Sequence, residues 1–262
     1  MRVTLLMAVI LVFAPVPGAV AQLTGAPSTD PRQLNFQLFE AAKKGRTRDV
    51  ALYLKHGASI QARDRFGNTA LLLAALSGRS KTVKVLLDAG STVNHRNLGG
   101  GTALLRAAKA GKRKSVKLLL DSGADGNLLN KKRLSPLAAA AFNGDDDTFR
   151  LLLDSGADID VTDSSGKSAI IYAAGKGFVE IVRALLDKGI DVNKTYGNDL
   201  TALMWAAGHS NDVPPVDAVK MVELLIERGA RLDLKDNRGK TARTIAADRG
   251  HEAVLKVLDK AK

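Results

Sequence analysis

The sequence contains no cysteine, and only 4% of its residues are aromatic, with Trp205 as the single tryptophan. The absence of cysteine excludes disulfide bonds, zinc–thiolate sites and lipid attachment through an N-terminal cysteine. It leaves both reducing and oxidising compartments open. Hydrophobic residues still make up 45% of the 262 residues, so the apolar content is mostly leucine, alanine, valine and isoleucine. Such a composition suits small repeated helices better than one large aromatic-rich core.

Long hydrophobic runs are also scarce, and the one near the N-terminus is short. Met1 and Arg2 form a minimal basic region, residues 3–14 are apolar, and residues 19–21 supply an A-x-A cleavage pattern. This order is typical of a secretory signal peptide. The alternative, a membrane anchor, needs about 20 continuous apolar residues. Because no second run of spanning length follows, we expect an exported protein without a transmembrane segment after signal removal.

Two glycines and a threonine or serine recur with a period of 33 residues along the rest of the chain. The three series are Gly45, Gly78, Gly111, Gly144 and Gly177; Gly57, Gly90, Gly123, Gly156 and Gly189; and Thr69, Thr102, Ser135, Ser168 and Thr201, with Thr241 following after 40 residues. The hydroxyl series predicts helix N-caps, because its oxygen can accept from an otherwise unpaired backbone N–H. One glycine series separates one helix from the next. The other follows helix ends such as "LLLDSG", where a left-handed residue is preferred.

The segments between these markers share one frame, seen in "TALLLAALSGRSKTVKVLLDAGSTVNHRN" at residues 69–97. It predicts a short helix with small alanine pairs, a tight turn, a second amphipathic helix and an extended polar segment. The frame resembles the ankyrin-repeat unit, G-x-T-P-L-H-x-A-A-x-x-G-H-x-x-V-V-x-L-L-L-x-x-G-A-D-V-N, over about residues 34–262. The resemblance implies an all-α solenoid of about seven helix–turn–helix units with projecting turns. In most units alanine replaces the family's proline, which is retained only as Pro136, and an apolar or small residue replaces its histidine.

The repeat register also predicts the domain organisation. We predict a signal peptide at residues 1–21, a flexible lead-in at residues 22–33 and a repeat domain at residues 34–262. The units are expected at about residues 34–67, 68–100, 101–133, 134–166, 167–199, 200–239 and 240–262. The first and last units are truncated in the manner of end caps. We expect the protein to be a monomer.

The sixth unit carries seven extra residues between its two helices. Ser210 stands where the 33-residue frame places a glycine, and residues 211–217 follow as an insertion. Loop insertions cost little closure entropy, so tolerance alone can explain this one. Two prolines should stiffen it, and Asp217 is expected to cap a helix that begins at Ala218. Its position beside Trp205 makes the insertion a candidate lip of a binding face.

The sequence offers no constellation for catalysis. Two Gly-Lys-Ser/Thr fragments, at residues 166–168 and 239–241, look like the end of a phosphate-binding loop but lack its earlier glycine. The four histidines lie in four different units, and only His209 with Asp212 and Asp217 has arguable metal-ligand spacing, which a solvated polar loop explains better. We therefore expect a protein that is not an enzyme and has no cofactor, no metal and no catalytic residues.

The family resemblance implies a protein-binding concave face, made of the turns and the outward positions of the first helices. Carried over to this sequence, the turn positions are Arg65, Phe66, Leu98, Lys131, Lys132, Tyr196 and Asn198. The helix positions are Leu73, Leu76, Arg106, Lys109, Phe142, Tyr172, Lys176 and Trp205. Aromatic residues and arginine dominate interface energetics, so the aromatic members favour binding. The alternative is that Tyr172 and Trp205, equivalent positions one unit apart, only pack against each other.

A second candidate surface comes from the residues after the mid-repeat glycines. In the first three units they are basic, at Arg46, Arg48, Arg79, Lys81, Lys112 and Lys114, and in the fourth they become acidic at Asp145 and Asp147. With units about 10 Å apart, the basic ladder would be about 20 Å long. It lies at helix starts, where the helix dipole disfavours basic residues, so its recurrence indicates an anionic partner. The alternative is a solvated, solubilising face.

Two functions follow from these surfaces. The first is a non-catalytic scaffold that binds a partner protein through its concave face. Exported ankyrin proteins without disulfides look most like those of Gram-negative periplasms, some of which resemble accessory proteins to catalases or other envelope enzymes. The resemblance therefore favours the periplasm, with secretion as the alternative. The second function is binding of an anionic polymer, such as lipopolysaccharide, another envelope polyanion or nucleic acid, through the basic ladder.

Overall fold

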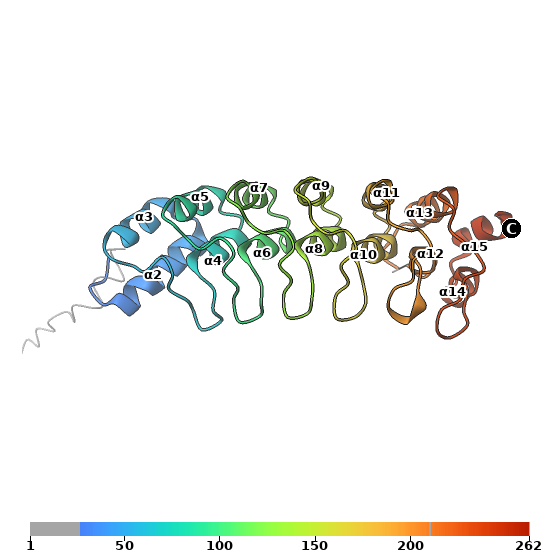
Figure 1. The fold of residues 1–262 in the computed structure, drawn as a ribbon, viewed down its shortest axis with the longest axis horizontal. Helices are drawn as coiled ribbons and strands as arrows, with labels where there is room; N and C mark the ends of the chain where they lie inside the picture. Colours follow the sequence, from blue (N-terminus) through green and yellow to red (C-terminus); the bar gives the residue numbers. More distant parts are fainter. Residues whose placement is uncertain (1–26, 210, 262) are drawn as a thin grey trace, which may run out of the picture.

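The computed structural model describes residues 27–209 and 211–261 (Figure 1). Within these residues it contains fourteen α-helices, a short 3-10 helix at Gly197–Asp199, and no β-strand beyond an isolated bridge between Tyr196 and Leu200. The predicted all-α fold class is therefore confirmed. The predicted signal peptide lies outside the described residues, as does most of the lead-in. None of the described helices is long and apolar enough to span a membrane.

The helices form two layers that run along the length of the molecule (Figure 1). The first-helix layer contains α2 (Pro31–Lys44), α4 (Ala70–Leu76), α6 (Ala103–Lys109), α8 (Pro136–Asn143), α10 (Ala169–Lys176), α12 (Ala202–Ala207) and α14 (Ala242–Arg249). The second-helix layer contains α3 (Thr47–Lys55), α5 (Ser80–Asp88), α7 (Arg113–Asp121), α9 (Asp146–Asp154), α11 (Val179–Asp187), α13 (Pro215–Glu227) and α15 (Glu252–Lys260). Each helix packs against its neighbours in the same layer. The turns project from the first-helix layer, away from the second helices.

The hydroxyl series lies at the N-caps of the first helices, as predicted. At four positions the hydroxyl oxygen accepts from the backbone N–H three residues later, at distances of 3.0 to 3.3 Å. These positions are Thr102, Ser135, Thr201 and Thr241. Thr69 and Ser168 occupy the same slot without making this hydrogen bond. The series therefore fixes where the helices begin even where the side chain does not cap.

The mid-repeat glycines lie where the next unit makes its closest approach. A β-carbon added at Gly45 would lie 2.7 Å from the side chain of Arg79, and one at Gly144 would lie 2.5 Å from the ring of Phe178. Both glycines also have positive φ angles, of 76° and 68°. Only glycine satisfies the close approach and the left-handed backbone together.

The core lies between the two layers and is built from small and branched aliphatic side chains. It is one continuous cluster that extends from Leu34 to Leu258. The predicted alanine pairs of the first helices are almost fully buried; they are Ala74-Ala75, Ala107-Ala108, Ala173-Ala174 and Ala206-Ala207. Small side chains at these positions let neighbouring helices approach closely, and Tyr53 and Phe149 are the only aromatic side chains among the largest fully buried ones of the described residues.

Two helix starts differ from the expectation. Helix α2 begins at Pro31, inside the predicted lead-in, because the Asp30 carboxylate accepts from the backbone N–H of Arg32 at 3.0 Å and proline is well suited to the first turn. Helix α13 begins at Pro215 rather than at Ala218. Asp217 therefore lies in the first turn and does not cap the helix. Part of the insertion extends α13 instead of forming a loop.

Candidate protein-interaction surface

An aspartate or asparagine side chain organises most of the turns between units. Asp64 Oδ1 accepts from the backbone N–H groups of Phe66 at 2.8 Å and Asn68 at 2.9 Å. The same arrangement recurs at Asn97, Asn130, Asp163 and Asp236. Neighbouring tips are joined by backbone hydrogen bonds, the first of which runs from the N–H of Leu98 to the carbonyl of Phe66 at 3.0 Å. The turns therefore form one connected ridge.

Six of the seven predicted turn residues are on this exposed ridge, and Tyr196 is not. The exposed residues are Arg65, Phe66, Leu98, Lys131, Lys132 and Asn198. Tyr196 is only 8% exposed, because it stands in the slot of the turn-organising aspartate and its hydroxyl lies 3.4 Å from Asp160 Oδ1. Burial and the charge of Asp160 raise the pKa of Tyr196 to about 12. Its expected role as a binding residue is corrected to a structural one.

The eight predicted helix positions all reach the surface, but they do not form a single patch. Leu76, Lys109 and Phe142 are exposed, and Leu73, Arg106, Tyr172, Lys176 and Trp205 are half-buried. Four of them, Phe142, Tyr172, Lys176 and Trp205, line one hollow near the C-terminal end. Leu73 lines another near the N-terminal end together with the turn residues Arg65 and Phe66. Leu76, Leu98, Arg106, Lys109, Lys131 and Lys132 line neither hollow.

The C-terminal hollow has a volume of about 290 Å³ and is built by α8, α10, α12 and α14. Phe142 and Tyr172 form an edge-to-face ring pair with centroids 5.3 Å apart. The ammonium group of Lys167 lies 4.7 Å from the centroid of the Trp205 ring and 5.8 Å from that of Tyr172. Tyr172 thus pairs with Phe142, and Lys167 covers Trp205, an arrangement that differs from the alternative in which Tyr172 and Trp205 pack against each other. On the other side of Trp205 a second hollow of about 470 Å³ continues toward Asn198.

Hydrogen bonding fixes one wall of this hollow. The hydroxyl of Tyr172 donates to Asp163, the aspartate that organises the adjacent turn. Burial and this hydrogen bond raise the pKa of Tyr172 to about 12. Burial alone would raise the pKa of Asp163, but hydrogen bonds from Tyr172, Ser165 and backbone N–H groups lower it overall. The pair is therefore neutral tyrosine with ionised aspartate at physiological pH, and it holds the aromatic ring in a fixed orientation.

The hollow is cationic and contains an unused donor. Its charged lining residues are Lys167, Lys176 and Arg249, and none of its lining residues is acidic. The indole Nε1 of Trp205 is buried without a hydrogen-bond partner among the described residues. An unpaired buried donor costs about 1–3 kcal/mol. The hollow thus combines aromatic surface with positive charge, which suits an acidic ligand, and the unpaired indole N–H lies buried beneath this surface.

Comparisons with known proteins give the family of this fold. The family model described as "Ankyrin repeats (3 copies)" matches residues 38–130 and 137–215, and the model described as "Ankyrin repeat" matches residues 198–237. The chain belongs to the ankyrin-repeat family. Ankyrin repeats are in general non-catalytic scaffolds for protein–protein interaction. No protein with curated function matches this ankyrin-repeat chain.

A solved structure supports the same assignment. The ankyrin-repeat chain is similar to the crystal structure of the human ASB11 ankyrin repeat domain, with a TM-score of 0.74 and 28% sequence identity. The match covers 86% of this chain and 97% of that one. The solenoid predicted from the repeat register is therefore confirmed.

Three basic or imidazole side chains of the hollow were not predicted from the sequence. Lys167 directly precedes the N-cap Ser168, whereas His209 and Arg249 come from the next two units. A signal for Lys167 exists in the register, because it lies between the turn glycine Gly166 and the N-cap Ser168 of the helix that carries Tyr172. The register also indicates His209 and Arg249, because each stands eight residues after the N-cap of its first helix, as Lys176 does.

One buried side chain anchors the insertion to the stack, while five of its seven residues are exposed. Val213 is only 5% exposed and covers Gly177, taking the place that Phe178 has over Gly144. His209 is also buried, and its ring stacks on that of His251 with centroids 3.7 Å apart. The interpretation of His209 as part of a solvated loop is therefore wrong. No cluster of metal-ligating side chains occurs in the part of the chain that the structure describes.

The six residues of the basic ladder lie at the starts of α3, α5 and α7, as the register implied. Their surroundings differ from the expectation, because Arg79 Nε donates to the carbonyl of Lys43 at 3.2 Å, at the C-terminal end of α2. Arg46 pairs with Asp49 at 3.3 Å, and Lys112 packs over Gly78. A helix C-terminus favours a cation, so the choice of arginine at position 79 has a partner inside the protein. Arg48, Lys81 and Lys114 are exposed and form no ion pair among the described residues.

Proposed function

We propose that the protein is a non-catalytic scaffold that binds an acidic partner protein through its concave face, with the hollow around Trp205 as the main contact. The ankyrin-repeat fold supports the class of function. The N-terminal sequence pattern supports export, with the periplasm as the site of action and an envelope enzyme as the kind of partner. The choice of this hollow as the main contact rests on the chemistry of the residues that line it.

One observation carries the proposal. The single tryptophan of an aromatic-poor chain lies half-exposed in a hollow with Phe142 and Tyr172, and its indole N–H has no partner among the described residues. Tryptophan and tyrosine in partly enclosed pockets supply most of the energy of many protein interfaces. An aspartate or glutamate side chain of a partner would neutralise Lys167, Lys176 or Arg249, and it would accept from the buried indole N–H once the side chains that cover this group move aside.

The test compares what the protein retains from an envelope extract with what two sets of variants retain. Trp205→Phe with Tyr172→Phe preserves the apolar bulk but removes the N–H donor and the Tyr172 hydroxyl. Lys176→Glu with Arg249→Glu reverses the charge of the rim. We expect each pair to reduce retention of the specific partner at least about tenfold, which corresponds to about 1.4 kcal/mol.

The matched control reverses charge at Lys81 and Lys114, which lie outside the hollow. This variant should retain the same partner as the natural protein, and circular dichroism should show the same helix content in all variants. Because Trp205 is the only tryptophan, its fluorescence should shift when the purified partner is added. Unchanged retention by both hollow variants would rule out this surface.

The basic ladder gives the alternative function, binding of an anionic polymer. Arg48, Lys81 and Lys114 remain available for such a ligand. The two functions differ in their response to salt, because a polyanion binder loses affinity steeply as salt rises. Loss of binding in the ladder variant but not in the hollow variants would favour this alternative.

A further inference from the structure

Six of the seven helices of the second-helix layer form a basic half and an acidic half, and α15 beyond them holds two side chains of each sign. With their N-cap residues, α3, α5 and α7 hold ten basic and three acidic side chains. The next three helices, α9, α11 and α13, hold nine acidic and three basic side chains. The sign changes between α7 and α9, and the six helices lie side by side in one row (Figure 1). The layer is therefore a dipole along the long axis of the molecule.

Where the two halves meet within one chain, they form an ion pair. Arg113 at the start of α7 lies 3.3 Å from Asp147 at the start of α9. Away from this junction the charges have no counterpart of the opposite half within reach. Arg48, Lys81 and Lys114 on the basic half form no ion pair within residues 27–209 and 211–261, and neither do Glu223 and Glu227 on the acidic half.

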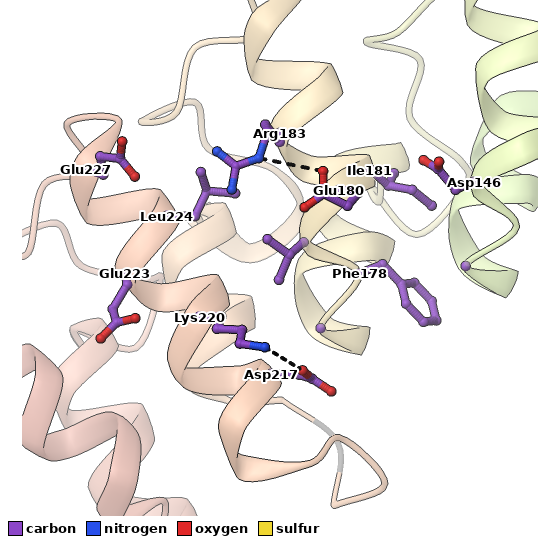
Figure 2. A pocket seen from close by; sticks show the side chains of 13 residues that line it. Asp146, Phe178, Glu180, Ile181, Arg183, Asp217, Lys220, Glu223, Leu224 and Glu227 are labelled. Carbon is purple, nitrogen blue, oxygen red and sulfur yellow. Dashed lines mark ion pairs between the residues drawn. The ribbon is translucent and has the colours of Figure 1, made fainter.

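The surface of the acidic half also contains a groove. A groove of about 570 Å³ lies along α11 and α13, lined by five carboxylate residues and two basic ones. Figure 2 shows the two basic residues engaged with carboxylates of the groove itself, Arg183 with Glu180 at 3.7 Å and Lys220 with Asp217 at 3.9 Å. Glu223 and Glu227 of α13 also line this groove. The groove has the size and charge to receive long basic side chains.

The net positive charge of the whole chain favours self-association through this layer over self-association through other surfaces. The six helices together hold nearly equal numbers of basic and acidic side chains, although the chain has a formal net charge of +12. Nearly all of the excess positive charge therefore lies outside this layer. Two copies that approach through the layer avoid most of the repulsion that would oppose any other mode of self-association.

We propose that two copies of the chain associate antiparallel through their second-helix layers. A two-fold axis between α7 and α9, parallel to the helices, places α3 of one copy opposite α13 of the other, α5 opposite α11, and α7 opposite α9. Because the units repeat at a constant spacing, every basic helix then meets an acidic one. The two large apolar side chains that are exposed on these six helices, Leu52 on α3 and Val216 on α13, lie on helices that face each other.

This arrangement uses both halves of the layer in one closed dimer, as a two-fold interface requires. It departs from the monomer expected from the sequence. It leaves the concave face free, so a dimer presents two hollows on its outer sides. Each exposed ion pair contributes little by itself, so the association depends on many pairs acting together and on low ionic strength.

The experiment measures the molar mass of the full chain by sedimentation equilibrium as a function of salt. The natural protein should be a dimer at about 10 mM ionic strength, where the screening length is about 30 Å, and a monomer at about 1 M, where it is about 3 Å. A basic-half variant carries Arg48→Glu, Lys81→Glu and Lys114→Glu. An acidic-half variant carries Asp147→Lys, Glu180→Lys and Glu223→Lys. Each variant alone should be a monomer at both salt concentrations.

Mixing the two variants separates the proposal from a simple loss of folding. In the mixture every reversed helix of one variant faces a complementary helix of the other, so an equimolar mixture should form a heterodimer at low salt. A monomeric natural protein at low salt overturns the proposal, and so does a mixture that stays monomeric. Species that grow beyond two copies with concentration would show open head-to-tail stacking and also overturn it. The Trp205→Phe, Tyr172→Phe variant should dimerise normally, so the concave-face proposal succeeds or fails separately.

Discussion

A single contact, repeated between units, shows how different residues serve the same role. The side chain that follows the mid-repeat glycine of one unit lies over the mid-repeat glycine of the unit before it. Arg79 lies over Gly45 in this way, and Phe178 lies over Gly144. In the sixth unit Val213 does the same over Gly177 from within the insertion. The contact requires a side chain that fills the space over the glycine, and it does not require a particular chemical group. Because glycine has no side chain, either an aliphatic stem or an aromatic ring can pack against its backbone.

This contact yields a prediction at the residue scale. Gly144→Ala should destabilise the protein by about 3 kcal/mol, because the new β-carbon would lie 2.5 Å from the Phe178 ring and the φ of 68° is unfavourable for alanine. Gly156→Ala is the matched control, since its φ is 83° but nothing lies within 4 Å. It should cost only about 1 kcal/mol. Urea unfolding followed by circular dichroism measures both values.

The double variant Gly144→Ala, Phe178→Ala isolates the steric part of this cost. Relative to Phe178→Ala alone, the added alanine should cost no more than Gly156→Ala does. An equal cost of Gly144→Ala with and without the Phe178 ring would show that backbone strain alone is responsible.

At the scale of the element, helix starts are set by more than the capping hydrogen bond. Thr69 and Thr102 are buried N-cap residues of α4 and α6 with nearly the same backbone conformation. Only Thr102 accepts from a backbone N–H, at 3.1 Å from that of Leu105. Both helices begin at the same position of the repeat. Packing of the alanine pairs and leucines therefore holds α4 at its position without the N-cap hydrogen bond.

These two threonines allow a controlled measurement. Thr102→Ala should lower the free energy of unfolding by about 1 kcal/mol more than Thr69→Ala does, because both lose the same atoms but only the first loses a capping hydrogen bond. Thermal and urea unfolding of the two variants give the difference. Equal losses in both would mean that the cap bond contributes nothing to stability at this site.

The insertion is an element in its own right. Residues 215–217 extend α13 at its N-terminal end, and Val213 is buried against α10, so the segment completes the stack at a point where the repeat glycine is absent. Asp212 also lies 4.0 Å from Lys176, which lines the hollow. Deleting residues 211–217 would therefore remove packing as well as any lip, and point changes such as Asp212→Ala report on the lip alone.

At the scale of the whole molecule, stability follows from the linear arrangement of units. Each unit contacts only its neighbours, so units in the middle have two packed sides and units at the ends have one. We expect backbone amides in α6, α8 and α10 to exchange with solvent at least about tenfold more slowly than those in α2 and α14. Hydrogen exchange followed by mass spectrometry measures this gradient. Uniform protection along the chain would show instead that the molecule unfolds only as one unit.

Much of the architecture followed from the repeat register, because a 33-residue period places caps, glycines and alanine pairs at fixed positions of a known supersecondary unit. The same register predicted the exposed positions at Phe66, Phe142 and Trp205. It placed Tyr196 wrongly on the surface, since it cannot show that an aromatic residue in the aspartate slot turns into the stack. The burial of His209 was missed because it depends on stacking against His251 of the next unit. Arg249 was missed although it occupies the same repeat position as Lys176.

The sequence by itself determined the helices, their order, the composition of the core and the candidate binding positions. Each of these depends on local periodicity and on backbone preferences that single residues carry. Only the tertiary structure decided which candidates meet in one hollow, that Lys167 covers Trp205, and that Val213 anchors the insertion. It also arranged the basic and acidic halves in one continuous layer. These features arise from the spacing and curvature of stacked units, which no short stretch of sequence contains.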